Sequence, residues 1–252
     1  MGRHSSLGSI TAADRARVLC QALRGSCQGR DMNPLLATIR ASPETLQKEP
    51  PMPSRFLNLM LTPDVQAAQA RYYGRSQDRP GTSASALFGE DEIAFIAEMD
   101  SFYLGTVNRD GWPYIQHRGG AKGFLKVLEP AALGFADLKG NRQLLTTGNL
   151  THDGRICLFL MSYPLQARLK ILGRAEILSA KEHPELAKAL IPPGQELVTE
   201  RLFRIQVEAF DWNCPQHITP RFTEAQVSEA IRPLQQRISD LETQLAQRDR
   251  RT

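Results

Sequence analysis

Several features that would assign this sequence to a class of protein at once are missing from it. No run of residues approaches the roughly 18 consecutive apolar residues of a membrane-spanning helix. Neither a Gly-x-Gly-x-x-Gly fingerprint nor a phosphate-loop motif occurs. We therefore expect no membrane partner, and we do not expect the parallel nucleotide-binding sheet that those motifs accompany.

Cysteine is scarce and scattered. The four cysteines, Cys20, Cys27, Cys157 and Cys214, do not have the spacing of a disulfide framework. The sequence therefore predicts a reducing compartment, and we expect a cytoplasmic protein. Cys157 lies in an apolar run and is interpreted as a small buried hydrophobe. Cys214 and His217 offer at most two ligands, so no metal site is expected.

The positive charge of the chain is unevenly distributed. The formal net charge is +4, from 31 Lys and Arg and 27 Asp and Glu. Residues 1–55 hold 8 of these cations and 4 of the anions, which leaves 23 of each sign in the remainder. Because the remainder is neutral, it has no net excess of cations to hold a phosphate backbone, and no nucleic-acid partner is expected.

The first 53 residues differ in character from the rest. They lack amphipathic order and end in a proline cluster, so we predict a disordered extension over residues 1–53. Its first thirty residues are rich in Arg and Ser and nearly free of acids, which resembles a transit peptide; the alternative is that translation starts at Met52. We expect a folded domain over residues 54–222 and a C-terminal helix over residues 223–252.

Short apolar runs separated by turn signals fill the predicted domain. Asp110-Gly111 lies between two such runs and predicts a β-hairpin, because glycine accepts the positive φ of the turn. Further strands are predicted at residues 133–136, 156–162, 168–178 and 202–210, and helices at residues 62–73, 89–99 and 184–191. Short strands at hairpin spacing, broken by short helices, predict a mainly β fold, a small antiparallel barrel with flanking helices.

The tail has a separate pattern. Residues 223–226 form a predicted capping box. Apolar residues follow in steps of four and three, at Val227, Ile231, Leu234, Ile238, Leu241 and Leu245. This spacing is typical of a coiled-coil seam, and Pro233 predicts a kink or a fresh start of the helix. Two interpretations stay open: a helix packed on its own domain, and a helix that forms a dimer.

Two cationic positions suggest an anion site. Gln116 and Arg118 are two residues apart on a predicted strand, so their side chains share one face. Asn141-Arg142 lies in a polar turn that opens a predicted helix, where backbone N–H groups favour a phosphate. The alternative is a solvated surface, where most arginines are found.

An ordered set of motifs resembles a known family. Residues 111–114, the strand through Arg118, and residues 134–137 and 140–143 are similar to the flavin-binding core of the pyridoxamine 5′-phosphate oxidase superfamily. Residues 210–221 resemble its predicted flavin-nucleotide-binding branch. The resemblance implies an antiparallel split β-barrel that binds FMN at the interface of a homodimer.

The resemblance also implies roles for particular residues over about residues 55–222. The implied cofactor contacts are Gln116, His117, Arg118, Gly119, Phe135, Ala136, Asn141, Arg142 and Gln143. Gln116 and Gln143 stand where the family usually has Arg and Lys, and we expect Arg118 to take over the first of these roles. The Arg-x-His substrate motif of the oxidase is missing, so vitamin B6 oxidation is not expected.

Trp212 begins a segment rich in Asn and Pro that ends near Arg221. Trp212 is a candidate to close over a bound ring, with His217 or Arg221 as the candidate catalytic group that meets a substrate. The alternative is a structural turn, since Asn and Pro are ordinary turn residues.

Three functions follow from these observations. The preferred one is an FMN-dependent oxidoreductase acting on a small substrate, with FAD, a deazaflavin or haem as less favoured cofactors. The second is a flavin-binding or haem-binding carrier or sensor without turnover. The third is an interaction protein that dimerises through residues 223–248.

Overall fold

The computed structural model describes residues 55–79, 81, 87–213 and 216–250. The chain divides into two units: residues 47–221 form one, and the segment from Phe222 onward belongs to the other. The predicted extension over residues 1–53 lies outside the described residues.

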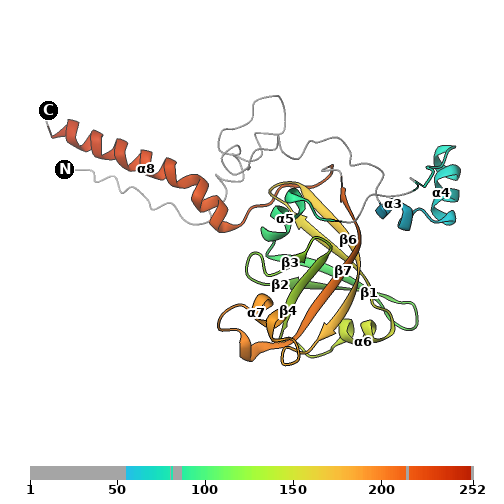
Figure 1. Cartoon of the computed structure of the whole chain (residues 1–252). Helices are drawn as coiled ribbons and strands as arrows, with labels where there is room; N and C mark the ends of the chain where they lie inside the picture. The colour runs from blue at the N-terminus through green and yellow to red at the C-terminus, as the bar shows by residue number, and fades with distance from the viewer. Residues whose placement is uncertain (1–54, 80, 82–86, 214–215, 251–252) are drawn as a thin grey trace. The chain divides into compact units, whose positions relative to one another are not determined.

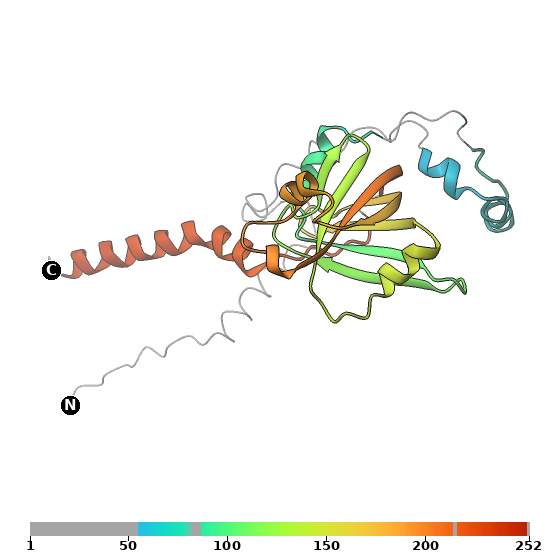
Figure 2. The ribbon, with the colours of Figure 1, turned by 60° about the horizontal axis from the view of Figure 1, so that its bottom comes forward.

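Seven strands form a single antiparallel sheet in the order β2-β1-β5-β6-β7-β4-β3. They are β1 (Ser101–Val107), β2 (Pro113–Gly119), β3 (Lys126–Glu129), β4 (Ala132–Leu138), β5 (Arg155–Ser162), β6 (Ala167–Leu178) and β7 (Thr199–Asn213). The described edge strands β2 and β3 do not pair with each other, so the curled sheet stays open (Figures 1 and 2). The predicted split β-barrel with flanking helices is confirmed, and β3 is a strand that the sequence pattern did not reveal.

The helices of this unit are short. They are α3 (Arg55–Met60), α4 (Pro63–Tyr73), α5 (Glu90–Ala97), α6 (Leu145–His152), α7 (Pro184–Leu190) and the 3-10 turn η2 (Glu196–Val198). α4 begins as predicted, because the Thr62 hydroxyl accepts the N–H of Val65 at 3.3 Å. It ends at Gly74, which has φ 69°. Helix α6 contacts β1 and β6, and α7 contacts β4 and β7 at the same end of the sheet (Figure 1).

The β1–β2 turn is built as predicted. The Asn108 side-chain oxygen accepts the backbone N–H groups of Asp110 at 3.0 Å and Trp112 at 2.8 Å. Gly111 has φ 87°, in the left-handed region that glycine tolerates. The turn fixes the register of β1 against β2, with Phe102 opposite Arg118 and Leu104 opposite Gln116.

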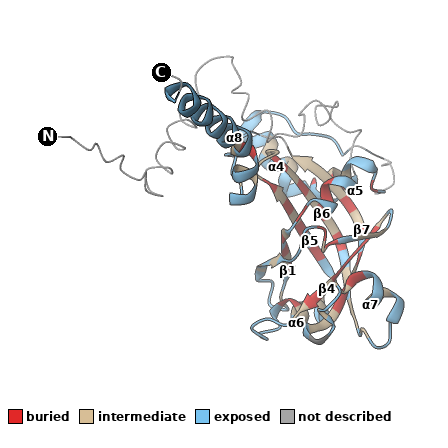
Figure 3. Ribbon diagram, turned by 90° about the vertical axis from the view of Figure 1, so that its left-hand side faces the viewer, coloured by how far each residue is buried: buried red, intermediate tan, exposed pale blue. Residues whose placement is uncertain are grey.

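Residues that alternate along the strands separate an inner face from an outer one (Figure 3). Phe102, Leu104, Phe135 and Phe203 are almost completely buried, and the rings of Phe135 and Phe203 stack at 4.7 Å. Cys157 lies at the opposite parity and is exposed, so its predicted burial is wrong. Partial desolvation nevertheless raises the pKa of its thiol.

Gly173 lies where β6 is pressed closely against β7. The register between these strands shifts at Leu172 and Gly173, and a Cβ on Gly173 would lie 2.6 Å from the Gln206 carbonyl oxygen. Because that oxygen is part of a paired strand, it cannot move aside easily. We expect Gly173→Ala to lower the free energy of unfolding by about 2 kcal/mol in urea denaturation.

The control for this substitution is Gly148→Ala in α6. An added Cβ there meets no atom within 4 Å. Alanine is the better helix former, so this variant should unfold at an equal or higher urea concentration, with a gain of at most about 1 kcal/mol. Equal stability of the Gly173→Ala protein and the unsubstituted protein would contradict the close approach of β6 and β7.

The second unit contains helix α8 (Glu224–Asp249). Thr223 caps it as predicted: its hydroxyl accepts the N–H of Gln226 at 3.2 Å, and its own N–H donates to the Gln226 side-chain oxygen at 2.8 Å. Pro233 lies inside the helix. It does not divide α8 in two, which excludes the predicted fresh start.

Candidate functional site

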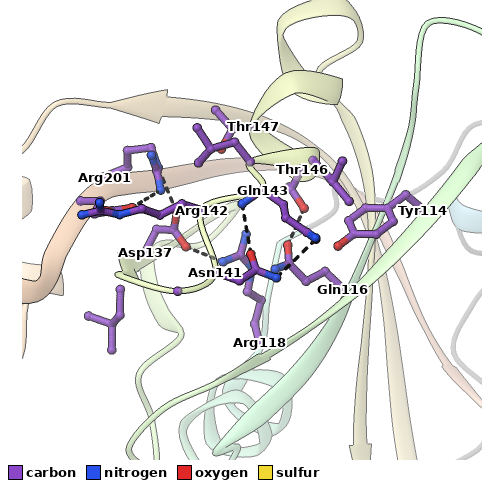
Figure 4. Close-up of a pocket in the computed structure, with 15 residues that line it drawn as sticks. Tyr114, Gln116, Arg118, Asp137, Asn141, Arg142, Gln143, Thr146, Thr147 and Arg201 are labelled. Carbon is purple, nitrogen blue, oxygen red and sulfur yellow. Dashed lines mark hydrogen bonds and ion pairs between the residues drawn. The ribbon is translucent and has the colours of Figure 1, made fainter.

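A cavity of about 210 Å³ opens at one side of the barrel (Figure 4). Its wall is formed by β2, the end of β4, the start of β7, the turn at residues 140–144 and the start of α6. Five of the predicted cofactor contacts line it, namely Gln116, Arg118, Asn141, Arg142 and Gln143. The strand and the turn, about 25 residues apart in sequence, therefore contribute to one site.

Asp137 is the buried centre of this site. One of its carboxylate oxygens accepts from Nη1 of Arg118, and the other accepts from Nε of Arg201 at 3.0 Å. The Asp137 side chain is 5% exposed and that of Arg118 is 15% exposed. The guanidinium of Arg118 also lies over the rings of Phe135 and Phe203, 5.8 Å and 5.4 Å from their centroids. Arg118 is therefore held in one orientation by the core below and the carboxylate beside it.

A second carboxylate extends this chain of charges to the turn. Glu200 accepts from Arg201 at 2.7 Å and pairs with Arg142 at 3.4 Å. Three arginines thus alternate with two carboxylates, and the cluster has a net charge of +1. The Arg142 side chain is 63% exposed, so its ion pair is weak and it can turn toward a ligand.

The turn before α6 gives the cavity its backbone donors. Arg142 and Leu144 have φ values of 60° and 57°, in the left-handed region. The helix therefore begins at Leu145, three residues beyond Arg142, and its N-cap residue Leu144 provides no capping hydrogen bond from its side chain. The N–H groups of the first turn have no acceptor within the helix, and Leu145, Thr146 and Thr147 line the cavity. Such a terminus attracts an anion.

Two side-chain donors in the same wall also lack an acceptor within the described part of the chain. The Thr146 hydroxyl donates to the Gln116 side-chain oxygen at 2.7 Å, which fixes the amide and leaves its nitrogen as a donor toward the cavity. Nε of Arg118 is buried and has no hydrogen-bond partner among the described residues. A buried polar atom without a partner is rare in folded proteins, and a ligand that accepts hydrogen bonds would satisfy it.

The other predicted contacts on β2 and β4 lie outside the cavity lining. His117 and Gly119 are exposed at the opposite parity from Arg118. The His117 ring meets Tyr103 edge-on, with ring centroids 5.6 Å apart. Phe135 belongs to the core beneath Arg118, and Ala136 points away from it with intermediate exposure.

Trp212, predicted to cover a bound ring, and the candidate catalytic residues His217 and Arg221 lie elsewhere in the barrel unit. Nε1 of Trp212 donates to Glu92 at 2.6 Å, and its ring packs edge-on against Phe95. The Arg221 guanidinium lies over the Tyr163 ring at 4.5 Å. His217 has φ 63° in the segment between them. These three residues do not line the cavity.

Sequence reasoning did not assign a role to Asp137, Thr146, Glu200 or Arg201. The position of Asp137 could have been predicted, because it lies two residues after Phe135 on an apolar strand and therefore faces the same inner side of the sheet. The position of Arg201 could not, because it reaches Asp137 through the pairing of β4 with β7, in which the two residues are direct partners. Among the described residues, no three His, Cys, Asp or Glu side chains gather in a metal-binding group, and no helix is long and apolar enough to cross a bilayer.

Comparisons with known proteins give one family match and several similar solved structures. Residues 90–213 match the pyridoxamine 5′-phosphate oxidase family, and no curated protein matches the chain. A Lactobacillus delbrueckii protein assigned as a pyridoxamine 5′-phosphate oxidase is 18% identical, with a TM-score of 0.40, and the match covers 50% of this chain and 94% of that one. HupZ of Group A Streptococcus is 16% identical, with a TM-score of 0.40 and coverage of 54% and 100%. An FMN-binding protein of Syntrophomonas wolfei is 14% identical, with a TM-score of 0.35 and coverage of 48% and 83%.

Proposed function

This chain belongs, through residues 90–213, to the pyridoxamine 5′-phosphate oxidase superfamily, and on that premise we propose that it is an FMN-binding oxidoreductase acting on a small substrate. The observation that carries the proposal is the convergence in one cavity of Arg118, Arg142 and Arg201 with the uncapped start of α6. Each of these features attracts an anion, and the phosphate of FMN is the anion that the family suggests.

The charges of the cavity fit a phosphate. The five ionised groups sum to +1, and the helix terminus adds roughly half a positive charge. Both carboxylates already accept hydrogen bonds from arginine, so they repel an anion less than unpaired carboxylates would. Arg118 Nε and the Gln116 amide nitrogen supply donors that have no other acceptor among the described residues.

The size of the cavity limits which part of the cofactor it receives. At about 210 Å³ it is smaller than the ~300 Å³ at the lower end of ligand pockets that enclose a whole molecule. It suits a phosphate and part of the ribityl chain, which leaves the ring to be covered by other surfaces. We therefore propose that a second copy of the chain completes the site, in a homodimer.

The outer face of the β1–β2 hairpin is the proposed contact with that second copy. Tyr103, Val107 and Ile115 share this face and are exposed, Ile115 by 68%, and Trp112 at the turn is 72% exposed. Apolar side chains gathered on one sheet face are more than the scattered exposed hydrophobes of an ordinary surface. Burying them against a second copy would remove them from water.

The residues of the chain have separate tasks in this proposal. Arg118, held by Asp137 and the core, is a fixed cation for the phosphate, while Arg142 approaches the phosphate from the exposed side of the cavity. Gln116, oriented by Thr146, donates to the same ligand. The bound flavin supplies the hydride or electron transfer, and the protein supplies orientation and charge.

One observation favours a second candidate, a flavin-binding or haem-binding carrier or sensor without turnover. Among the described residues that line the cavity, the only acids are Asp137 and Glu200, and both are paired with arginine. The lining contains no histidine, cysteine or lysine. Apart from the phenol of Tyr114, the described lining of the cavity therefore offers no free acid–base group to act on a substrate.

One experiment tests the proposal and separates the two candidates. The purified full chain is titrated with FMN while flavin fluorescence is recorded, and the complex is then mixed with NADH or NADPH in the absence of oxygen. Saturable binding followed by bleaching of the flavin absorbance supports the oxidoreductase. Binding without bleaching by either donor supports the carrier, and failure to bind FMN removes the proposal.

Arg142→Ala tests the exposed side of the cavity. Its loss removes one charge-assisted contact with the phosphate, so we expect FMN affinity to fall about tenfold, or about 1.4 kcal/mol. The control is Arg155→Ala, an exposed arginine at the start of β5 that pairs with Asp153 outside the cavity. Equal FMN affinities of the two variants would place the phosphate elsewhere.

A further inference from the structure

Helix α8 exposes a continuous apolar stripe. Leu234, Ile238, Leu241 and Leu245 are 47%, 56%, 41% and 57% exposed, and they follow one another at spacings of four, three and four residues. Alternating steps of four and three repeat every seven residues, or 3.5 residues per step in a full repeat, which keeps the stripe on one side of a gently supercoiled helix. Single exposed leucines are common, but a stripe over several turns is typical of a surface that a second helix covers.

The residue types in the stripe select the kind of helix that fits it. Assigning Ile231 and Ile238 to heptad position a places Leu234 and Leu241 at position d. Isoleucine at a with leucine at d favours a parallel pair of helices over three-stranded or four-stranded bundles. The opposite side of α8 is polar, with Gln236 donating to Asp240 at 3.0 Å and Thr243 donating to the Ser239 carbonyl at 2.9 Å.

The charges beside the stripe add orientation and register. In this assignment Arg237 occupies position g and Glu242 occupies position e of the next heptad. A parallel, in-register pair of identical helices brings these two positions together, so Arg237 of each copy faces Glu242 of the other. In an antiparallel pair, g faces g and e faces e, and the arginine and glutamate do not meet.

We propose that α8 pairs with α8 of a second copy of this chain as a parallel two-stranded coiled coil. The pairing uses residues 227–245 and rests on residue types, spacing and charges that are independent of the cavity. It therefore stands or falls separately from FMN binding. The seam covers fewer than three heptads, so the pairing of the two helices is weak by itself. A second contact between the same two chains would strengthen it, because that contact raises the effective concentration of one helix near the other.

Disulfide formation tests the parallel register in the full chain. A cysteine at Leu241→Cys lies at a d position, where the two copies of a parallel, in-register pair come within disulfide distance. A cysteine at Thr243→Cys lies at position f, on the far side of each helix. Mild oxidation followed by peptide mapping should yield the 241–241 disulfide at least about tenfold more efficiently than the 243–243 disulfide. Equal yields, or no 241–241 disulfide, would overturn the pairing.

Exchange of charges tests the predicted partners directly. Arg237→Glu and Glu242→Arg each create two like-charge contacts in a dimer with itself, whereas a mixed dimer of the two variants regains two opposite-charge contacts. With about 0.2–0.5 kcal/mol for each contact of either sign, the mixed dimer should be favoured about tenfold. Two differently tagged chains are coexpressed and the mixed and pure dimers are counted by native mass spectrometry.

The matched control for the exchange is Arg232→Glu, at position b on the outer side of the same helix. Coexpressed with the unsubstituted chain, it should form mixed dimers in the statistical proportion. The same proportion for the Arg237→Glu and Glu242→Arg pair, or an absence of dimers from the unsubstituted chain, would contradict the proposal. Unchanged FMN binding in all these variants would leave the proposed function in place.

Discussion

An Arg118→Met protein is expected to bind FMN about 100-fold more weakly than the unsubstituted chain. Arg118 is the most buried cation of the cavity, its side chain is fixed by Asp137, and its Nε has no partner among the described residues. A hydrogen bond to a charged group in such surroundings contributes about 1.5–3 kcal/mol. A loss of about 2.7 kcal/mol corresponds to the expected change in affinity, measured by titration with FMN.

Methionine retains the apolar length of the side chain against Phe135 and Phe203, so that the loss reports on charge and hydrogen bonding. The control is Arg174→Met, on β6, where the arginine pairs with Glu208 and is 61% exposed. It should bind FMN as the unsubstituted chain does. Thermal unfolding followed by circular dichroism first shows whether each variant is folded. A folded Arg118→Met protein with unchanged FMN affinity would refute the assignment of this cavity.

Asp137→Asn is expected to lower the free energy of unfolding by about 3 kcal/mol. The Asp137 carboxylate joins two partly buried arginines, with one oxygen to each. The amide offers only one oxygen and turns an N–H donor toward the other arginine. Removing one partner of a buried ion pair leaves a charge without compensation, which costs about 3–5 kcal/mol. The measurement is urea denaturation of the apoprotein.

Glu208→Gln is a closely matched control for this substitution. Glu208 also joins two arginines, Arg55 at 3.1 Å and Arg174 at 3.2 Å, but these side chains are 48% and 61% exposed. Exposed ion pairs contribute roughly 0–1 kcal/mol, so the change in stability should be small. Similar losses of unfolding free energy in the two variants would mean that burial does not determine how much Asp137 contributes to stability.

The parts of the fold that could be predicted from the sequence are those with local causes. Neighbours within a few residues determine the hairpin turn after Asn108 and the Thr62 and Thr223 caps. They also determine the shared face of Gln116 and Arg118. Local hydrogen bonds and the two-residue period of a strand are properties of the chain itself. These predictions agree with the structure.

The remaining parts depend on pairing between distant strands or on unusual backbone angles. Arg201 meets Asp137 only because β4 pairs with β7 in one register, and no local pattern encodes that register. Cys157 is exposed because its parity on β5 is fixed by β1 and β6. The polar turn that opens α6 was predicted, but its left-handed residues Arg142 and Leu144 were not, because positive φ is rare outside glycine.

The residues with left-handed backbone conformation in the turn before α6 imply a conflict between thermal stability and ligand binding. Holding Arg142 and Leu144 with positive φ costs on the order of 1 kcal/mol each relative to glycine or asparagine. Selection for heat tolerance alone would therefore enrich glycine at both positions. At residue 142 that exchange would discard a cation of the proposed phosphate site, whereas at residue 144 it would not. A thermostable lineage that retains arginine at 142 while changing 144 would carry the signature of a turn kept for its ligand.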